Sequence, residues 1–161
     1  MQVLPGVLDR ALADGDAIFP SQPSLDGLNI LVAEDDLRLA RQLEQAIMDA
    51  GGYVVGPADT VSDALRLMNV ERVDGAILDT LLHREVPTLL AERLSDKKVP
   101  FVFHADVRPP DELRARFPLT PVCLKSMDVV ALVDALSDYL ERTLGGTQGE
   151  DRWSLAGRPA S

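Results

Sequence analysis

The sequence is short of cysteine, of basic residues and of long apolar runs, and each shortage argues against a class of protein. It has one cysteine, Cys123, among 161 residues, so no internal disulfide can form. Lys and Arg number 16 against 26 Asp and Glu, a formal net charge of -10, which disfavours binding to nucleic acid or to an anionic membrane surface. The N-terminus lacks the pattern of a signal peptide, and no run approaches the ~18 apolar residues of a membrane span. We therefore expect a cytoplasmic protein whose partners are proteins or cations.

Composition divides the chain into three segments. Residues 1–26 form an N-terminal arm that leads into the Pro- and Ser-rich stretch FPSQPSLDG. Within this arm, residues 3–12 repeat apolar side chains at helical spacing, and a short amphipathic helix and a frayed tail remain equally good interpretations. Residues 27–144 carry the patterns of a folded domain. We expect residues 145–161, GGTQGEDRWSLAGRPAS, to form a flexible tail.

The central segment alternates short apolar runs with helical patterns. Five runs, rich in Val, Ile, Leu or Phe, are typical of strands buried on both faces: 28–33, 53–56, 74–79, 99–105 and 120–125. Apolar residues at helical spacing follow each run. Five such repeats predict a doubly wound α/β fold with a five-stranded parallel sheet and five helices, because right-handed crossovers leave few other arrangements.

Charged side chains end three of the predicted strands. Glu34, Asp35 and Asp36 follow the first, Asp79 ends the third and Lys125 ends the fifth. Open parallel sheets bind ligands at the carboxyl ends of their strands, where the strand order reverses. With the order 2-1-3-4-5, the first and third strands are neighbours, so their carboxylates converge and require a cation. Mg²⁺ suits such oxygen ligands, and Lys125 is long enough to reach a phosphate oxygen.

Each of these residues alone has an ordinary structural explanation. Acids at the start of a helix interact with its dipole, an Asp can cap a turn, and a lysine is usually solvated. Their joint position at three strand ends favours a site, with Asp36 assigned to the cap of the first helix. The two histidines, His83 and His104, lack the spacing of a zinc site, and we interpret them as solvent-facing or structural.

The stretches ILVAEDD, DGAILDTLL and PVCLK resemble the receiver domains of two-component response regulators, over about residues 28–143. The resemblance implies a flavodoxin-like fold and Mg²⁺ bound by Glu34, Asp35, Asp79 and the backbone carbonyl of Leu81. It also implies that Asp79 accepts a phosphoryl group from a phosphohistidine and that Lys125 contacts this group. The stretch VPFVF is similar to a subgroup of stand-alone regulators.

The resemblance implies a role in signalling rather than an enzyme activity. The chain is expected to be a single-domain response regulator that a sensor histidine kinase, a phosphotransfer protein or a small phosphodonor phosphorylates on Asp79. It would then bind an output protein or serve as a phosphate sink in the phosphorelay, with slow self-dephosphorylation at most. The oligomeric state, including a homodimer, stays open, as do the kinase and the output protein.

Two positions depart from the family pattern. Receivers place Thr or Ser at the end of the fourth strand, where this chain has Ala105, and an aromatic residue three positions before the lysine, where it has Val122. Because a methyl group cannot donate a hydrogen bond to phosphate, a degenerate receiver that only binds partners is the alternative. The complete set of Glu34, Asp35, Asp79 and Lys125 argues against that alternative.

Two other classes of doubly wound enzyme are disfavoured at single positions. A dinucleotide-dependent oxidoreductase would need Gly-x-Gly-x-x-Gly after the first strand, where this chain has Glu-Asp-Asp. A phosphatase of the haloacid-dehalogenase type would need a second aspartate at the position of Leu81.

Overall fold

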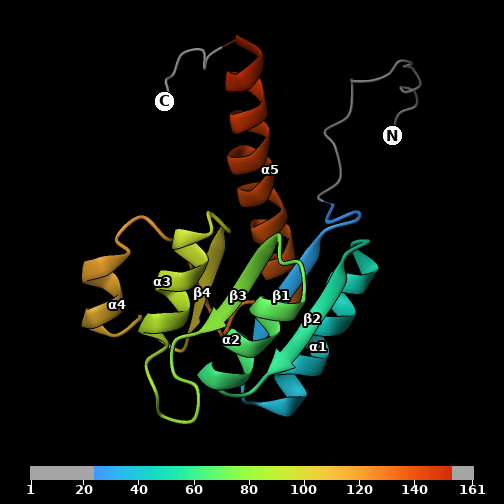
Figure 1. Cartoon of the computed structure of the whole chain (residues 1–161). Helices are drawn as coiled ribbons and strands as arrows, with labels where there is room; N and C mark the ends of the chain where they lie inside the picture. Colours follow the sequence, from blue (N-terminus) through green and yellow to red (C-terminus); the bar gives the residue numbers. More distant parts are fainter. Residues whose placement is uncertain (1–23, 154–161) are drawn as a thin grey trace.

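The short apolar runs form one parallel sheet in the computed structural model, which describes residues 24–153 (Figure 1). Its strands are β1 Asn29–Ala33, β2 Tyr53–Ala58, β3 Gly75–Asp79, β4 Phe101–Ala105 and β5 Val122–Leu124. Their order is β2-β1-β3-β4-β5, and each neighbouring pair is parallel. The predicted doubly wound sheet with the order 2-1-3-4-5 is therefore confirmed.

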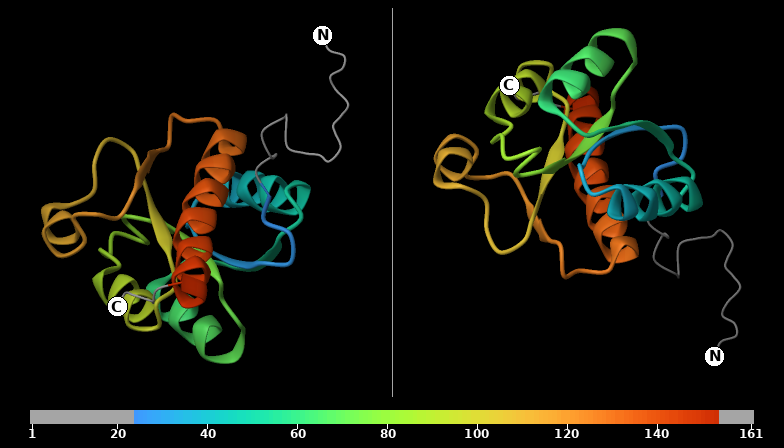
Figure 2. Two further views of the ribbon diagram at one scale, coloured as in Figure 1. Left: turned by 90° about the horizontal axis from the view of Figure 1, so that it is seen from above. Right: turned by 90° about the horizontal axis from the view of Figure 1, so that it is seen from below.

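A helix follows each strand, as the alternating pattern predicted. The helices are α1 Leu37–Asp49, α2 Val61–Val70, α3 Thr88–Asp96, α4 Asp111–Arg116 and α5 Val129–Trp153. Helices α1 and α5 cover one face of the sheet, and α2 and α3 cover the other (Figure 2). Asp36 caps α1, since its Oδ1 accepts the backbone N–H of Leu39 at 3.2 Å.

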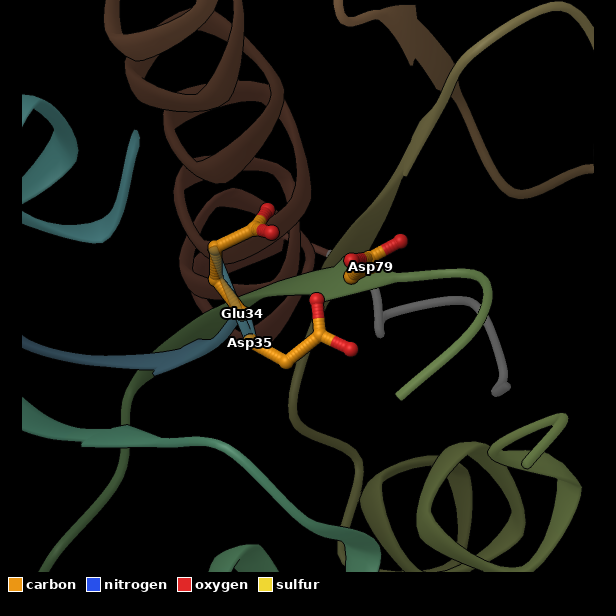
Figure 3. A group of neighbouring side chains, drawn as sticks. All are labelled: Glu34, Asp35 and Asp79. Carbon is orange, nitrogen blue, oxygen red and sulfur yellow. The ribbon is translucent and has the colours of Figure 1, made fainter. Parts of the chain in front are cut away.

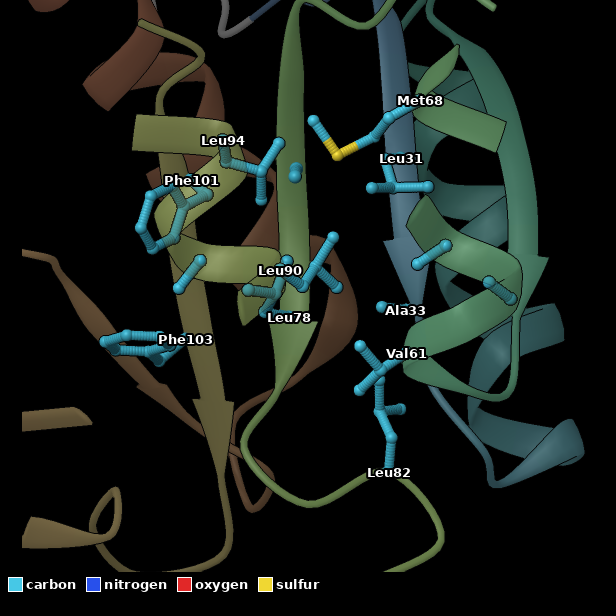
Figure 4. Packing of buried hydrophobic residues seen from close by; sticks show 14 of the residues in the cluster. Leu31, Ala33, Val61, Met68, Leu78, Leu82, Leu90, Leu94, Phe101 and Phe103 are labelled. Atoms are coloured by element: carbon cyan, nitrogen blue, oxygen red, sulfur yellow. The ribbon is translucent and has the colours of Figure 1, made fainter. Parts of the chain in front are cut away.

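Two apolar clusters fill the space between the sheet and its helices. Leu31, Leu78 and Phe103 face α2 and α3 in the cluster of Figure 4. Val32 and Ile77 belong to the opposite cluster, which contains residues of α1 and α5. Successive strand residues enter opposite faces, so burial on both sides fixes the register of each strand. The carboxyl ends of the strands are consequently held in fixed relative positions.

A bulge in β2 shapes the edge of the sheet beside β1. Gly56 has φ +100°, and a Cβ atom there would lie 3.1 Å from the carbonyl oxygen of Val32, so only glycine fits without strain. The pairing of β1 with β2 shifts at this point and resumes with Ala33 beside Ala58. The carbonyl of Ala58 then accepts the backbone N–H of Glu34 at 2.9 Å. The bulge therefore anchors the first acid after β1.

The N-terminal boundary of the domain lies earlier than the sequence suggested. Residues 24–26, assigned to the arm, pack on the domain: Leu25 is fully buried and its N–H donates to the carbonyl of Ala50 at 2.9 Å. Ser24 donates its N–H to Ser137 Oγ at 2.7 Å. The rest of the arm, including the amphipathic segment at residues 3–12, lies outside the described residues.

The last helix extends further than expected. Helix α5 runs to Trp153 and includes residues 145–153, which the sequence analysis placed in a flexible tail. It continues through Gly145 and Gly146, which lower helix propensity but, unlike proline, keep the backbone N–H that a helix needs. No helix in the described part of the chain combines the length and apolar character needed to cross a membrane.

Helix α3 ends in a left-handed residue, and this generates a prediction about stability. Lys98 has φ +60°, and its N–H donates to the carbonyl of Ser95, while the N–H of Val99 donates to Leu94. Glycine adopts this conformation without the penalty of a Cβ atom. We expect Lys98→Gly to raise the free energy of unfolding by about 0.5–1 kcal/mol, measured by urea denaturation. The exposed neighbour Lys97, with φ -85°, is the control. Lys97→Gly should lower stability, and a loss of stability in both variants would contradict the prediction.

Candidate functional site

Three carboxylates meet at the carboxyl end of the sheet (Figure 3). Glu34 and Asp35 follow β1, and Asp79 ends β3, the strand beside it. One ligand atom from each lies within 4.8 Å of the others. Glu34 and Asp79 are only 2% and 3% exposed, whereas Asp35 is partly exposed. The structure thus brings together the acids that the sequence placed at these two strand ends.

Lys125 reaches the cluster from the end of β5. Its Nζ donates to Asp79 Oδ2 at 3.0 Å and lies 3.6 Å from Glu34 Oε2. Its backbone N–H donates to the carbonyl of Ala105 at 2.7 Å, which ties the residue to the end of β4. Among residues 24–144, it is the one Lys or Arg within ion-pair distance of Glu34 or Asp79. The cluster therefore carries more negative than positive charge.

This imbalance changes the proton affinity of Asp79. Burial, followed by the negative charge of Glu34, raises the pKa of Asp79 to about 7, even though Lys125 and the N–H of Leu81 donate hydrogen bonds to it. Burial acts to lower the pKa of Lys125, but Asp79 and then Glu34 outweigh it and raise that pKa. A cation beside Asp79 would favour its ionised, nucleophilic form.

The pKa of Glu34 shifts in the opposite direction to that of Asp79. Burial alone would raise its pKa, but His104, the backbone N–H of Asp36 and its other neighbours, Asp79 and Lys125, lower the pKa below its usual value. Oε2 of Glu34 accepts the N–H of Asp36 at 3.1 Å. The buried pair therefore consists of one carboxylate held as an anion and one that readily takes up a proton.

The loop after β3 packs against the exposed side of the cluster. The N–H of His83 donates to Asp35 Oδ2 at 2.7 Å. Residues 82–85 form a tight two-residue turn, in which His83 and Arg84 have φ +48° and +68°. The side chain of His83 is 59% exposed and lies 3.6 Å from Asp59 Oδ2. The interpretation of His83 as a solvent-facing residue agrees with this position.

The position of His104 beside Glu34 was not predicted from the sequence. His104 is fully buried, and its Nδ1 lies 3.5 Å from Glu34 Oε1. Neither ring nitrogen has a hydrogen-bond partner, and Glu34 Oε1 has none either. The signal that could have revealed it is register, because His104 pairs with Asp79 across β3 and β4. A residue beside Asp79 on a strand buried on both faces has no route to solvent.

The remaining predicted positions are Leu81 after β3, Ala105 at the end of β4 and Val122 at the start of β5. Leu81 follows Asp79 by two residues, and its N–H donates to Asp79 Oδ1 at 3.2 Å. The metal-ligand role of its carbonyl stays a prediction. Ala105 is fully buried at the end of β4, and Val122 is 42% exposed at the start of β5. No hydroxyl therefore stands where the family pattern has one.

The donor set fits a hard divalent cation. Three carboxylates offer oxygen atoms within 4.8 Å of one another, close enough for one cation to lie between them, and two of the three are withdrawn from water. One buried oxygen, Glu34 Oε1, has no hydrogen-bond partner. Buried carboxylates with excess negative charge are stable when a cation or a proton offsets their repulsion.

Comparison with known proteins identifies the same fold in solved structures. A scan against protein-family models and a search of curated proteins each returned no match. The structure described as the response regulator PhyR from Brucella abortus has a TM-score of 0.67 and 21% identity, covering 79% of this chain and 53% of that one. A CheY-like response regulator receiver domain from Methanospirillum hungatei JF-1 has a TM-score of 0.65 and 16% identity, covering 74% and 98%.

SdrG from Sphingomonas melonis Fr1 has a higher sequence identity to this chain than these two structures. It is 34% identical with a TM-score of 0.58, and the match covers 68% of this chain and 95% of SdrG. The chain spans about half the length of the PhyR structures it matches, from Brucella abortus and Bartonella quintana. The sheet order, the acidic cluster at its switch point and these likenesses agree that the chain belongs to the receiver-domain family of response regulators.

Proposed function

We propose that this receiver accepts a phosphoryl group on Asp79 from a histidine kinase or a phosphotransfer protein. The observation that supports this most is the buried cluster of Glu34, Asp35 and Asp79, with Lys125 Nζ 3.0 Å from Asp79. The phosphorylated protein signals by binding an output protein or drains phosphate from a relay. In this proposal it is an acceptor and a messenger, without turnover of another substrate.

The proposed transfer uses each member of the cluster differently. A carboxylate oxygen of Asp79 attacks the phosphorus, a P–O bond forms, and the P–N bond to the donor histidine breaks. Lys125 already contacts the acceptor oxygen and would follow the negative charge onto the phosphoryl oxygens. Glu34, Asp35, Asp79 and the carbonyl of Leu81 would hold Mg²⁺, which neutralises charge on the transferred group.

A groove beside Lys125 offers a surface for the protein that donates the phosphoryl group. It has a volume of about 450 Å³ and lies between α1 and the start of α5. Val130, at its rim, is 58% exposed. The groove is lined by Leu39, Gln42, Gln45, Ala46, Asp49, Lys125, Met127, Asp128, Val129 and Val130. Its mixture of apolar and amide side chains suits a partner that docks reversibly.

Ala105 favours a second candidate function. A receiver that lacks the hydroxyl at this position lacks one hydrogen bond that could link phosphorylation to a change of shape. A degenerate receiver that only binds partners would also tolerate this alanine. The two candidates differ in whether Asp79 becomes covalently modified.

The first prediction from the proposed function separates these candidates by intact mass after incubation with acetyl phosphate, with and without Mg²⁺. We expect a Mg²⁺-dependent gain of one phosphoryl group in the wild-type protein and none in Asp79→Asn, because the amide is not a nucleophile. Asp59→Asn is the matched control, since Asp59 contacts His83 but lies outside the carboxylate cluster. No gain in the wild-type protein under any condition would favour the binding-only receiver.

The second prediction concerns pH and stability in the absence of divalent cations. The folded state binds the Asp79 proton more tightly than the unfolded state, since its pKa is about 7 rather than 3.8. Stability from this group is therefore present at low pH and is lost as pH rises through about 7. We expect the free energy of unfolding, measured in urea with EDTA, to fall between about pH 5 and about pH 8.

Asp79→Asn should remove that slope and be the more stable protein at about pH 8, by about 1–2 kcal/mol. The opposite effect of the lowered Glu34 pKa falls below its ordinary value of 4.5, outside this window. Added Mg²⁺ should flatten the wild-type curve by binding the ionised cluster. Equal slopes in the wild-type protein and the variant would contradict the assignment of the titration to Asp79.

The third prediction follows from Ala105. Phosphorylation should change amide hydrogen exchange little over residues 105–115, because the methyl group at position 105 makes no hydrogen bond to the phosphoryl group. Ala105→Ser, which adds one hydroxyl with little volume to this buried position, should enlarge the change. A large change in the wild-type protein, equal to that of the variant, would show that another residue links the site to this segment.

A further inference from the structure

We propose that His104 is a positioning residue of the carboxylate cluster, donating a hydrogen bond from Nδ1 to Glu34 Oε1 and so fixing the direction of this carboxylate. The inference rests on the proposed function, because it concerns how the cluster binds its cation. It assigns a role to the end of β4 that neither the acidic motif nor the predicted lysine contact includes.

Three buried polar atoms beside the cluster have no hydrogen-bond partner. In the described part of the chain, the buried side-chain nitrogen and oxygen atoms without a hydrogen-bond partner are Glu34 Oε1 and the two ring nitrogens of His104. Two of these three atoms face each other at 3.5 Å. A buried polar atom without a partner costs about 1–3 kcal/mol, and a shift of a few tenths of an ångström would satisfy both. Because a carboxylate only accepts, the hydrogen belongs on Nδ1.

The strands leave His104 few other partners. Its register neighbour on β3 is Asp79, which Lys125 and the N–H of Leu81 already satisfy. Its register neighbour on β5 is Cys123, whose thiol is a weak hydrogen-bonding group. With the imidazole fully buried, the exposed acids of the surface are out of reach. Glu34 is therefore the acceptor that this position of β4 offers.

The contact completes the support of Glu34 from inside the protein. Oε2 accepts the N–H of Asp36 at 3.1 Å and lies 3.6 Å from Lys125 Nζ. A hydrogen bond from His104 to Oε1 would restrain the second oxygen. A glutamate has more rotatable bonds than an aspartate, so fixing it in advance reduces the entropy lost when a cation binds. Outer partners of this kind typically contribute 10- to 100-fold to metal affinity.

The test compares the Mg²⁺ affinity of the unphosphorylated wild-type protein with that of two variants, and amide chemical shifts report binding. His104→Leu keeps an apolar volume and removes the donor, whereas His104→Asn retains an N–H donor close to the position of Nδ1. We expect His104→Leu to weaken Mg²⁺ binding by about 10- to 100-fold and His104→Asn to recover most of that loss. Each titration is paired with urea denaturation in EDTA. If His104 only stabilised the fold, the variants would lose stability, but His104→Leu and His104→Asn would bind Mg²⁺ with the same affinity.

A measurement on the wild-type protein guards against variants that fail to fold. The chain has two histidines, so ¹⁵N spectra of the imidazoles can be assigned with a single variant, His83→Gln. The proposal expects the proton of His104 on Nδ1, and a ring protonated on Nε2 alone would overturn it. Equal Mg²⁺ affinity in the wild-type protein and His104→Leu would also overturn it, as would an Asn variant as weak as Leu. A wild-type protein without Mg²⁺ binding would instead overturn the proposed function together with this role.

Discussion

Repulsion between buried carboxylates is the interaction on which the site depends. Glu34 and Asp79 are withdrawn from water at the ends of adjacent strands, and Lys125 alone balances them only in part. Burial, followed by the negative charge of Glu34, raises the pKa of Asp79 to about 7. A site in this condition takes up either a proton or a cation. The repulsion that destabilises the folded protein therefore also makes the charge of Asp79 depend on pH and on bound cations.

The sheet withstands this repulsion because its strands cannot move independently. Apolar clusters on both faces fix the register, and the bulge at Gly56 lets Ala58 hold the backbone of Glu34. The backbone bond from Lys125 to Ala105 joins β5 to β4 at the same edge. The acids are thus brought together by backbone geometry that hydrophobic burial stabilises, and not by attraction among the side chains themselves.

The fold and the convergence of the acids could be predicted from the sequence because buried parallel strands are nearly continuous apolar runs. The position of each acid then follows from chain direction. Leu25 could not be predicted in the same way, since a single apolar residue between Ser24 and Asp26 has no periodicity. The contact between His104 and Glu34 was missed because it depends on the pairing of β4 with β3 and on how a long side chain bends. Strand pairing and side-chain conformation are tertiary properties, which the sequence around Glu34 or around His104 does not determine by itself.

The end of β4 departs from the family pattern at Ala105, and the residue before it, His104, lies beside Glu34. Position 105 has a methyl group where a hydroxyl would contact the phosphoryl group, while position 104 has an imidazole 3.5 Å from Glu34. Successive residues of a strand point to opposite faces, so these two side chains serve different sides of the site. In the roles proposed above, β4 therefore offers the phosphoryl group no side-chain hydrogen bond at position 105, while His104 supports the carboxylate cluster.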